Sequence, residues 1–169
     1  VAPSLSPSMD IQVSSNFERL LFELLGRDGA MVRMLMKRFR ETGQFEVAPD
    51  ILAKACEAFS GFRLDDAGTR AEIARTASET GMVIDPHSAV GLAAARASRE
   101  NGIVVDEVPI VSLACAHPAK FPDVVLSATG VSPVLPPHMK DLMEREDRVS
   151  VIRNDMAEIQ SFVQSEMRS

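Results

Sequence analysis

A continuous apolar stretch, VPIVSLA at residues 108–114, constrains the fold of this chain more than any other feature. A strand with one face in water alternates apolar and polar residues, so this unbroken run predicts a strand covered on both faces, as in a parallel sheet. The chain offers few partners for such a strand. Only the short β-branched runs at 82–84 and 149–152 predict further strands. A sheet this poor in strands indicates the end of a larger α/β domain rather than a self-sufficient one.

Helical patterns account for most of the remaining sequence. Ser15 and Glu18 form the S-x-x-E pattern of a capping box, and an apolar stripe at helical spacing follows them. A helix beginning near Pro49 is expected to bury Leu52, Ala55, Cys56 and Phe59. Other helices are predicted at about 30–42, from Asp65 or Asp66 to about Thr80, from Pro86 to a cap at Gly102, within 115–130 after a tight turn, and at about 154–167.

Composition excludes several classes of function. The chain has 24 acidic and 18 basic residues, a net charge of −6, which argues against a nucleic-acid partner. It contains no Trp or Tyr, so base-stacking platforms are not expected. No apolar run approaches the ~20 residues that a membrane span needs. Two cysteines, Cys56 and Cys115, and the lack of a signal-peptide pattern predict a cytoplasmic protein.

Common catalytic and metal-binding motifs are missing from the sequence. The histidines His87, His117 and His138, taken with the two cysteines, show no zinc-ligand spacing, so no metal is predicted. His138 follows two prolines at an expected helix start and is predicted to lie on the surface. No G-x-S-x-G nucleophile motif and no glycine-rich phosphate loop occurs.

Two polar clusters lie where chemistry is expected. Ser14, Ser15 and Asn16 precede a helix, whose N-terminus favours an anion, and Arg19 follows one turn later; simple capping is the alternative. Cys115 and His117 directly follow the apolar strand, and ligands of open α/β sheets bind beyond the carboxyl ends of strands. The alternative there is a thiol that packs as a small apolar group and a histidine bonded to backbone.

Three stretches, in this order, resemble the C-terminal part of the pyridoxal-phosphate-dependent threonine synthases. They are LSPSMDIQVSSNFERLLFELLG at 5–26, DPHSAVGLAAA at 85–95 and ACAHPAKFPDVV at 114–125. The resemblance implies an α/β, predominantly helical chain that forms the C-terminal portion of a tryptophan-synthase-β-like fold (fold type II). It also implies a lyase of threonine biosynthesis, which converts O-phospho-L-homoserine and water into L-threonine and phosphate.

The same resemblance implies that residues 1–169 are a single C-terminal segment of a longer enzyme. In this family the Schiff-base lysine and the loop that holds the cofactor phosphate lie in the N-terminal half. The four lysines of this chain do not match the context of that lysine, and the segment alone is expected to be inactive. The segment is expected to contain no catalytic residue. Its expected partners are the N-terminal half of the same enzyme and the substrate O-phospho-L-homoserine.

Site residues follow from the family's motifs. In the pattern T-A-H-P-A-K-F the Thr faces the pyridine nitrogen of the cofactor, so the resemblance places Cys115 there, as a weaker hydrogen-bonding group. The matching SSN-x-ER motif implies that Ser15, Asn16 and Arg19 line the substrate side of the cleft. His117 is expected either to support the site or simply to pack. Ser88 replaces the usual Thr of DPHTAVG and keeps its hydroxyl.

Two alternatives to the enzyme hypothesis remain at this stage. One is a non-catalytic helical module, derived from the enzyme, that binds a partner or regulates it. The other is a different pyridoxal-phosphate lyase on the same fold. The first residue, Val1, is expected to be either a trimmed tail or a cut end, and a segment of a larger enzyme is expected to expose apolar surface.

Overall fold

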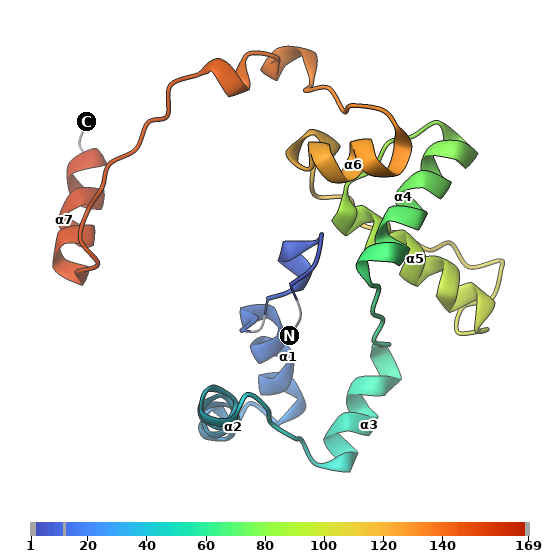
Figure 1. Cartoon of the computed structure of the whole chain (residues 1–169). Coiled ribbons are helices and arrows are strands. Elements are labelled where there is room, and N and C mark those ends of the chain that lie inside the picture. Colours follow the sequence, from blue (N-terminus) through green and yellow to red (C-terminus); the bar gives the residue numbers. More distant parts are fainter. Residues whose placement is uncertain (1–2, 12, 168–169) are drawn as a thin grey trace. The chain divides into compact units, whose positions relative to one another are not determined.

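The structure, a computed structural model, describes residues 3–11 and 13–167 (Figure 1). The chain divides between Pro133 and Val134 into two compact units. Within the described residues all regular structure is helical, and no strand is present. The predominantly helical class expected from the sequence is therefore confirmed.

The first unit contains six α-helices and two short 3-10 helices within its described residues. In chain order these are η1 (Pro7–Met9), α1 (Ser15–Leu24), α2 (Gly29–Thr42), α3 (Pro49–Ala58), α4 (Asp66–Thr80), α5 (Pro86–Glu100), η2 (Pro118–Lys120) and α6 (Pro122–Thr129). The described part of the second unit has η3 (Pro137–Met139), η4 (Leu142–Glu144) and α7 (Met156–Glu166).

Helix boundaries follow local capping chemistry. Asp65 and Asp85 cap α4 and α5 with carboxylates that accept from first-turn amides, and Gly81 ends α4 in the left-handed conformation. At α1 the expected capping residue is wrong by one position. Ser14, rather than Ser15, is the N-cap, because its backbone is extended and its hydroxyl accepts from the Phe17 amide.

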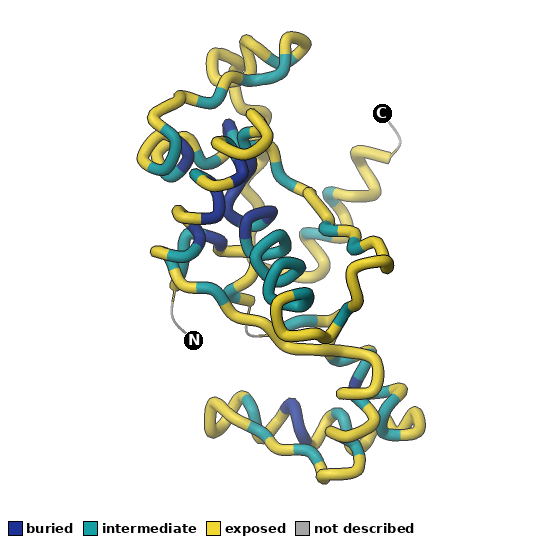
Figure 2. Tube along the Cα trace, turned by 90° about the vertical axis from the view of Figure 1, so that its right-hand side faces the viewer, coloured by how far each residue is buried: buried dark blue, intermediate teal, exposed yellow. Residues whose placement is uncertain are grey.

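Two small apolar cores stabilise the first unit (Figure 2). In one, Ile73 of α4 and Ala89 of α5 are fully buried beside the nearly buried Ile84, and Val124 and Ala128 of α6 pack against them. The other joins α1 and α2 through Leu21, Leu35 and Met36, against which Leu25, Val32, Phe45 and Val47 pack. The helix α4 contacts both α5 and α6, so these three form the best-packed group of the unit.

The three expected strands are not strands in this structure. Residues 82–84, 108–114 and 149–152 lie outside regular structure. In the run at 108–114, Val111 and Leu113 are 81% and 79% exposed rather than covered on both faces. A strand requires a hydrogen-bonded neighbour, and the described residues provide none for these runs.

Burial on α3 also differs from the expectation. The helix starts at Pro49 as predicted, but Leu52, Cys56 and Phe59 are exposed and Ala55 is half-buried. Helical spacing identifies an apolar face without showing what covers it. The C-terminal helix begins at Met156 after an Asp155 cap, two residues later than expected. His138 is exposed, as predicted, and the expectation about Val1 lies outside the described residues.

Candidate functional site

The first turn of α1 brings together three of the predicted site residues. The Arg19 guanidinium donates from Nη2 to Asn16 Oδ1 and from Nε to the Ser15 carbonyl, the latter at 3.4 Å. All three residues are exposed. Ser14 Oγ already accepts from the Phe17 amide, which leaves the amides of Ser15 and Asn16 without an acceptor among the described residues. The turn thus combines a cation with amide donors, the chemistry that binds an anionic group.

The second predicted group lies in the turn that precedes α6. Cys115 is exposed, and its thiol makes no hydrogen bond within residues 3–11 and 13–167. His117 is the N-cap of η2, and its Nδ1 accepts from the Ala119 amide at 3.2 Å. That bond agrees with a histidine bonded to backbone, one of the two roles that the sequence left open. Across the described part of the chain, no hydrogen bond or ion pair joins this group to the α1 group.

A buried carboxylate organises the start of α5. Both oxygens of Asp85 accept hydrogen bonds: Oδ1 from the amide and Nδ1 of His87, at 2.9 and 2.8 Å, and Oδ2 from the amide and hydroxyl of Ser88. The Asp85 side chain has no solvent exposure. Burial raises the pKa of this carboxyl, but the bonds from Ser88 and His87 outweigh it and hold the pKa below its ordinary value of 3.8.

The opposite edge of the His87 ring binds the N-terminal segment. Nε2 accepts from the Ser8 amide at 3.1 Å, across 79 positions of sequence. The ring also contacts the Phe121 ring, with 5.0 Å between their centroids. Residues from two of the three stretches that carry the family resemblance, 5–26 and 114–125, thus contact a residue of the third.

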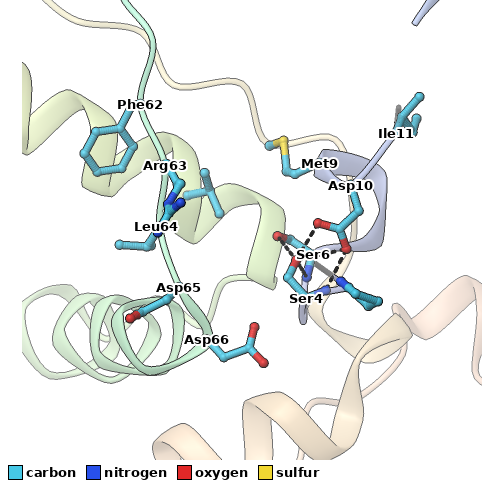
Figure 3. Close-up of a pocket in the computed structure, with 12 residues that line it drawn as sticks. Ser4, Ser6, Met9, Asp10, Ile11, Phe62, Arg63, Leu64, Asp65 and Asp66 are labelled. Atoms are coloured by element: carbon cyan, nitrogen blue, oxygen red, sulfur yellow. Dashed lines mark hydrogen bonds between the residues drawn. The ribbon is translucent and has the colours of Figure 1, made fainter. Parts of the chain in front are cut away.

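Residues 4–10 form a compact turn beside the start of α4. Asp10 accepts from the Ser4 amide at 2.7 Å and from the Ser4 hydroxyl, and Asp66 accepts from the Leu5 amide at 3.0 Å. A groove lies between this segment and residues 62–66 (Figure 3). Its carboxylates serve as local acceptors, and the five predicted site residues do not line it.

The described residues meet the requirements neither of a metal site nor of a membrane-spanning helix. No group of three or more His, Cys, Asp or Glu side chains among them is arranged to hold a metal ion. None of the described helices is long and apolar enough to cross a bilayer.

Sequence reasoning missed the role of His87. From the sequence, this histidine is weighed only as a metal ligand, and Asp85 only as the end of the short strand expected at 82–84. The available signal was the local spacing D-P-H-S, because an N-cap aspartate lies close to the side chains two and three residues later. The bond to Ser8 had no local signal, since it joins distant parts of the chain.

Comparisons with known proteins point to one family. The family model "Threonine synthase, C-terminal" matches residues 88–163. The chain is 45% identical to the threonine synthase of Pseudomonas aeruginosa over 162 residues, which are 95% of this chain and 34% of that protein. It is 37% identical to the threonine synthase of Corynebacterium glutamicum, over 94% of this chain and 33% of the relative.

Solved structures agree with the sequence relatives. The crystal structure of PLP-bound threonine synthase from Brucella melitensis matches with a TM-score of 0.79 and 43% identity, over 100% of this chain and 35% of that one. The yeast threonine synthase structure matches with a TM-score of 0.76 and 30% identity, over 99% of this chain and 37% of the yeast chain. The chain therefore spans about a third of the length of the relatives it matches.

Proposed function

The chain matches the C-terminal part of threonine synthases, and on this premise we propose that it contributes to an enzyme that makes L-threonine. The proposed reaction converts O-phospho-L-homoserine and water into L-threonine and inorganic phosphate, with pyridoxal phosphate as cofactor. The observation that carries this proposal is the match, over the whole chain, to a PLP-bound threonine synthase structure. The enzyme would be a cytoplasmic lyase of amino-acid biosynthesis.

The proposed role of Cys115 is to face the pyridine nitrogen of the cofactor. An exposed thiol with no hydrogen bond in the described residues is a suitable neutral partner for that nitrogen. A bound pyridoxal phosphate supplies an electron sink for negative charge at the substrate carbons. A neutral partner leaves the ring nitrogen largely unprotonated, and so Cys115 would moderate that sink. His117 would support the turn through its bond to the Ala119 amide.

Ser15, Asn16 and Arg19 would line the substrate side of the cleft. Asn16 and the Ser15 carbonyl hold the Arg19 guanidinium against the first turn of α1, beside the amides of Ser15 and Asn16, which have no acceptor among the described residues. Such a set binds and orients an anionic substrate. The remaining part of the longer enzyme would supply the Schiff-base lysine and the loop for the cofactor phosphate.

Two measurements on the full-length enzyme test this function. Titration with pyridoxal phosphate should produce the absorbance of a bound cofactor, and O-phospho-L-homoserine should yield threonine and phosphate in equal amounts. A bound cofactor with turnover of a different amino acid would instead indicate another lyase of the same fold. Absence of cofactor binding would favour the alternative, a non-catalytic helical module.

A further inference from the structure

We propose that His87 is a positioning residue, which fixes residues 4–10 and the turn at Phe121 relative to the buried start of α5. The hydrogen bonds that define this role are observed in the structure and do not depend on the proposed function. Its consequence for turnover rests on the proposed function, because the stretches that meet at His87 carry the proposed site residues.

The hydrogen bonds of the His87 ring define one tautomer. Nδ1 lies 2.8 Å from Oδ1 of Asp85, a carboxylate that can only accept. Nε2 lies 3.1 Å from the Ser8 amide, which can only donate. The proton is therefore on Nδ1, and the ring is a neutral bridge that donates to Asp85 and accepts from Ser8.

The bridge rests on a rigid base. Asp85 is anchored by three further bonds, from the amides of His87 and Ser88 and from the Ser88 hydroxyl. The His87 side chain itself is 12% exposed. A ring held on a buried, fully bonded carboxylate has little freedom, so it can define where the Ser8 backbone lies.

This arrangement is not a hydrolytic triad, although it contains Asp, His and Ser. In a triad, the imidazole nitrogen distal to the carboxylate accepts from a nucleophile hydroxyl. Here that nitrogen accepts from a backbone amide, and the Ser88 hydroxyl donates to the carboxylate directly. The geometry suits holding a segment rather than activating a nucleophile.

Two site-bearing stretches meet at this ring. Residues 4–10 lead into the α1 turn that carries Ser15, Asn16 and Arg19. Phe121, whose ring centroid is 5.0 Å from that of His87, closes the turn that begins at Cys115. Loss of the bridge should therefore release the N-terminal segment and disturb both sides of the proposed cofactor site.

The test compares two substitutions that each retain one edge of the ring. In the full-length enzyme, His87→Gln places an amide oxygen near the position of Nε2 and can still accept from Ser8. His87→Asn reaches only the position of Nδ1 and loses that bond. His138→Asn is the matched control, because His138 is exposed in the second unit. The readouts are hydrogen exchange of the peptide containing Ser8, the absorbance of bound pyridoxal phosphate, kcat and KM.

We expect the three variants to rank in the same order for amide exchange at Ser8 and for turnover, with His87→Asn affected most. His87→Asn should speed exchange at Ser8 roughly tenfold, the effect of one lost hydrogen bond, alter the cofactor absorbance and lower kcat more than KM. His87→Gln should stay within about twofold of wild type in exchange. His138→Asn should change neither exchange nor kcat.

Several outcomes would overturn the proposal. If Ser8 exchanges at the wild-type rate in His87→Asn, His87 does not anchor this segment. Faster exchange at Ser8 in His87→Gln would lead to the same conclusion. The His87→Gln result tests the proposal even if His87→Asn fails to fold. Faster exchange in His87→Asn with wild-type kcat and absorbance would remove the positioning role. If the wild-type enzyme makes no threonine but Ser8 exchange still responds, the proposed function fails while the anchor stands.

Discussion

At the residue scale, Asp85 is the side chain whose replacement is most informative. Both carboxylate oxygens of Asp85 accept hydrogen bonds, so the amide nitrogen of an asparagine placed at either oxygen position would face another donor. Asp85→Asn is expected to lower the free energy of unfolding by about 2 kcal/mol, the cost of an unsatisfied buried donor. Urea unfolding of the full-length enzyme at pH 7 measures this change.

Asp65→Asn is the matched control for that substitution. Asp65 caps α4 in the same way, but it is exposed and accepts from the Gly68 amide alone among the residues described. Asparagine caps helices as well as aspartate does, so this variant should unfold like wild type. Equal losses in the two variants would show that capping, rather than the buried network, explains the effect.

The Asp85 network also predicts a pH dependence. Because the folded state lowers the pKa of this carboxyl below 3.8, its stabilisation is complete above that value and is lost as pH falls through the lower, folded-state pKa. The difference in unfolding free energy between wild type and Asp85→Asn should therefore shrink on acidification below about pH 4. Urea unfolding at pH 7, 5 and 3 checks this, and a constant difference would contradict the assignment.

Cys115 gives a residue-scale test of the proposed cofactor wall. Cys115→Thr supplies a better hydrogen-bonding hydroxyl and should retain or raise kcat/KM, whereas Cys115→Ala should lower it about fivefold. Cys115→Ala should also shift the absorbance of the bound cofactor. Cys56→Ala, at an exposed cysteine on α3, is the control and should change neither property. Wild-type kinetics and absorbance in Cys115→Ala would place the cofactor elsewhere.

The sequence allowed contacts within the candidate site to be predicted only where the residues lie close together in the chain. The α1 group follows from SSN-x-ER, and the structure joins Asn16 and Arg19 as that spacing permits. The N-cap shifted from Ser15 to Ser14 because the two serines have nearly the same capping propensity, and backbone conformation decides between them. The Ser8–His87 bond was unpredictable, since it depends on tertiary packing.

At the element scale, helices were predictable and strands were not. Asp65, Pro86 and Gly81 give helix boundaries through local capping and dihedral preferences, so α4 and α5 lie close to the expected positions. A strand depends on a neighbour that local sequence cannot supply. The apolar run at 108–114 lies outside regular structure and is largely exposed, so its interpretation as a strand covered on both faces was wrong.

The pairing of α4 with α5 provides an element-scale prediction. Arg96 of α5 contacts Glu72 and Glu79 of α4, both at 2.8 Å, and Glu72 is largely buried. Arg96→Met leaves the Glu72 carboxylate without its cation and should lower the free energy of unfolding by about 2 kcal/mol. The expected loss of unfolding free energy is smaller than for a fully buried ion pair, because the Arg96 side chain is 32% exposed.

The control for Arg96 lies on the same network. Arg75 contacts Glu79 at 2.8 Å on an exposed face within α4, so Arg75→Met should leave stability nearly unchanged. Urea unfolding of both variants in the full-length enzyme measures the difference. An Arg96→Met variant as stable as Arg75→Met would show that the link between the helices contributes little.

At the scale of the whole molecule, exposed apolar side chains predict that the chain needs a covering partner. Val111, Leu113, Leu52 and Phe59 are all more than half exposed, in segments whose sequence patterns predict burial. Isolated residues 1–169 should therefore bind a hydrophobic dye and self-associate, whereas the full-length enzyme should not. A monodisperse 18.4 kDa monomer without dye binding would contradict this interpretation.

The most direct measurement of the central claim compares phosphate release from O-phospho-L-homoserine by the full-length enzyme and by residues 1–169 alone, both with pyridoxal phosphate. The account predicts release, matched by threonine formation, from the full-length enzyme and none from the 169 residues. Turnover by the 169 residues alone, or a cofactor-loaded full-length protein that leaves this substrate intact, would contradict the assignment of the chain as the non-catalytic wall of a threonine synthase site.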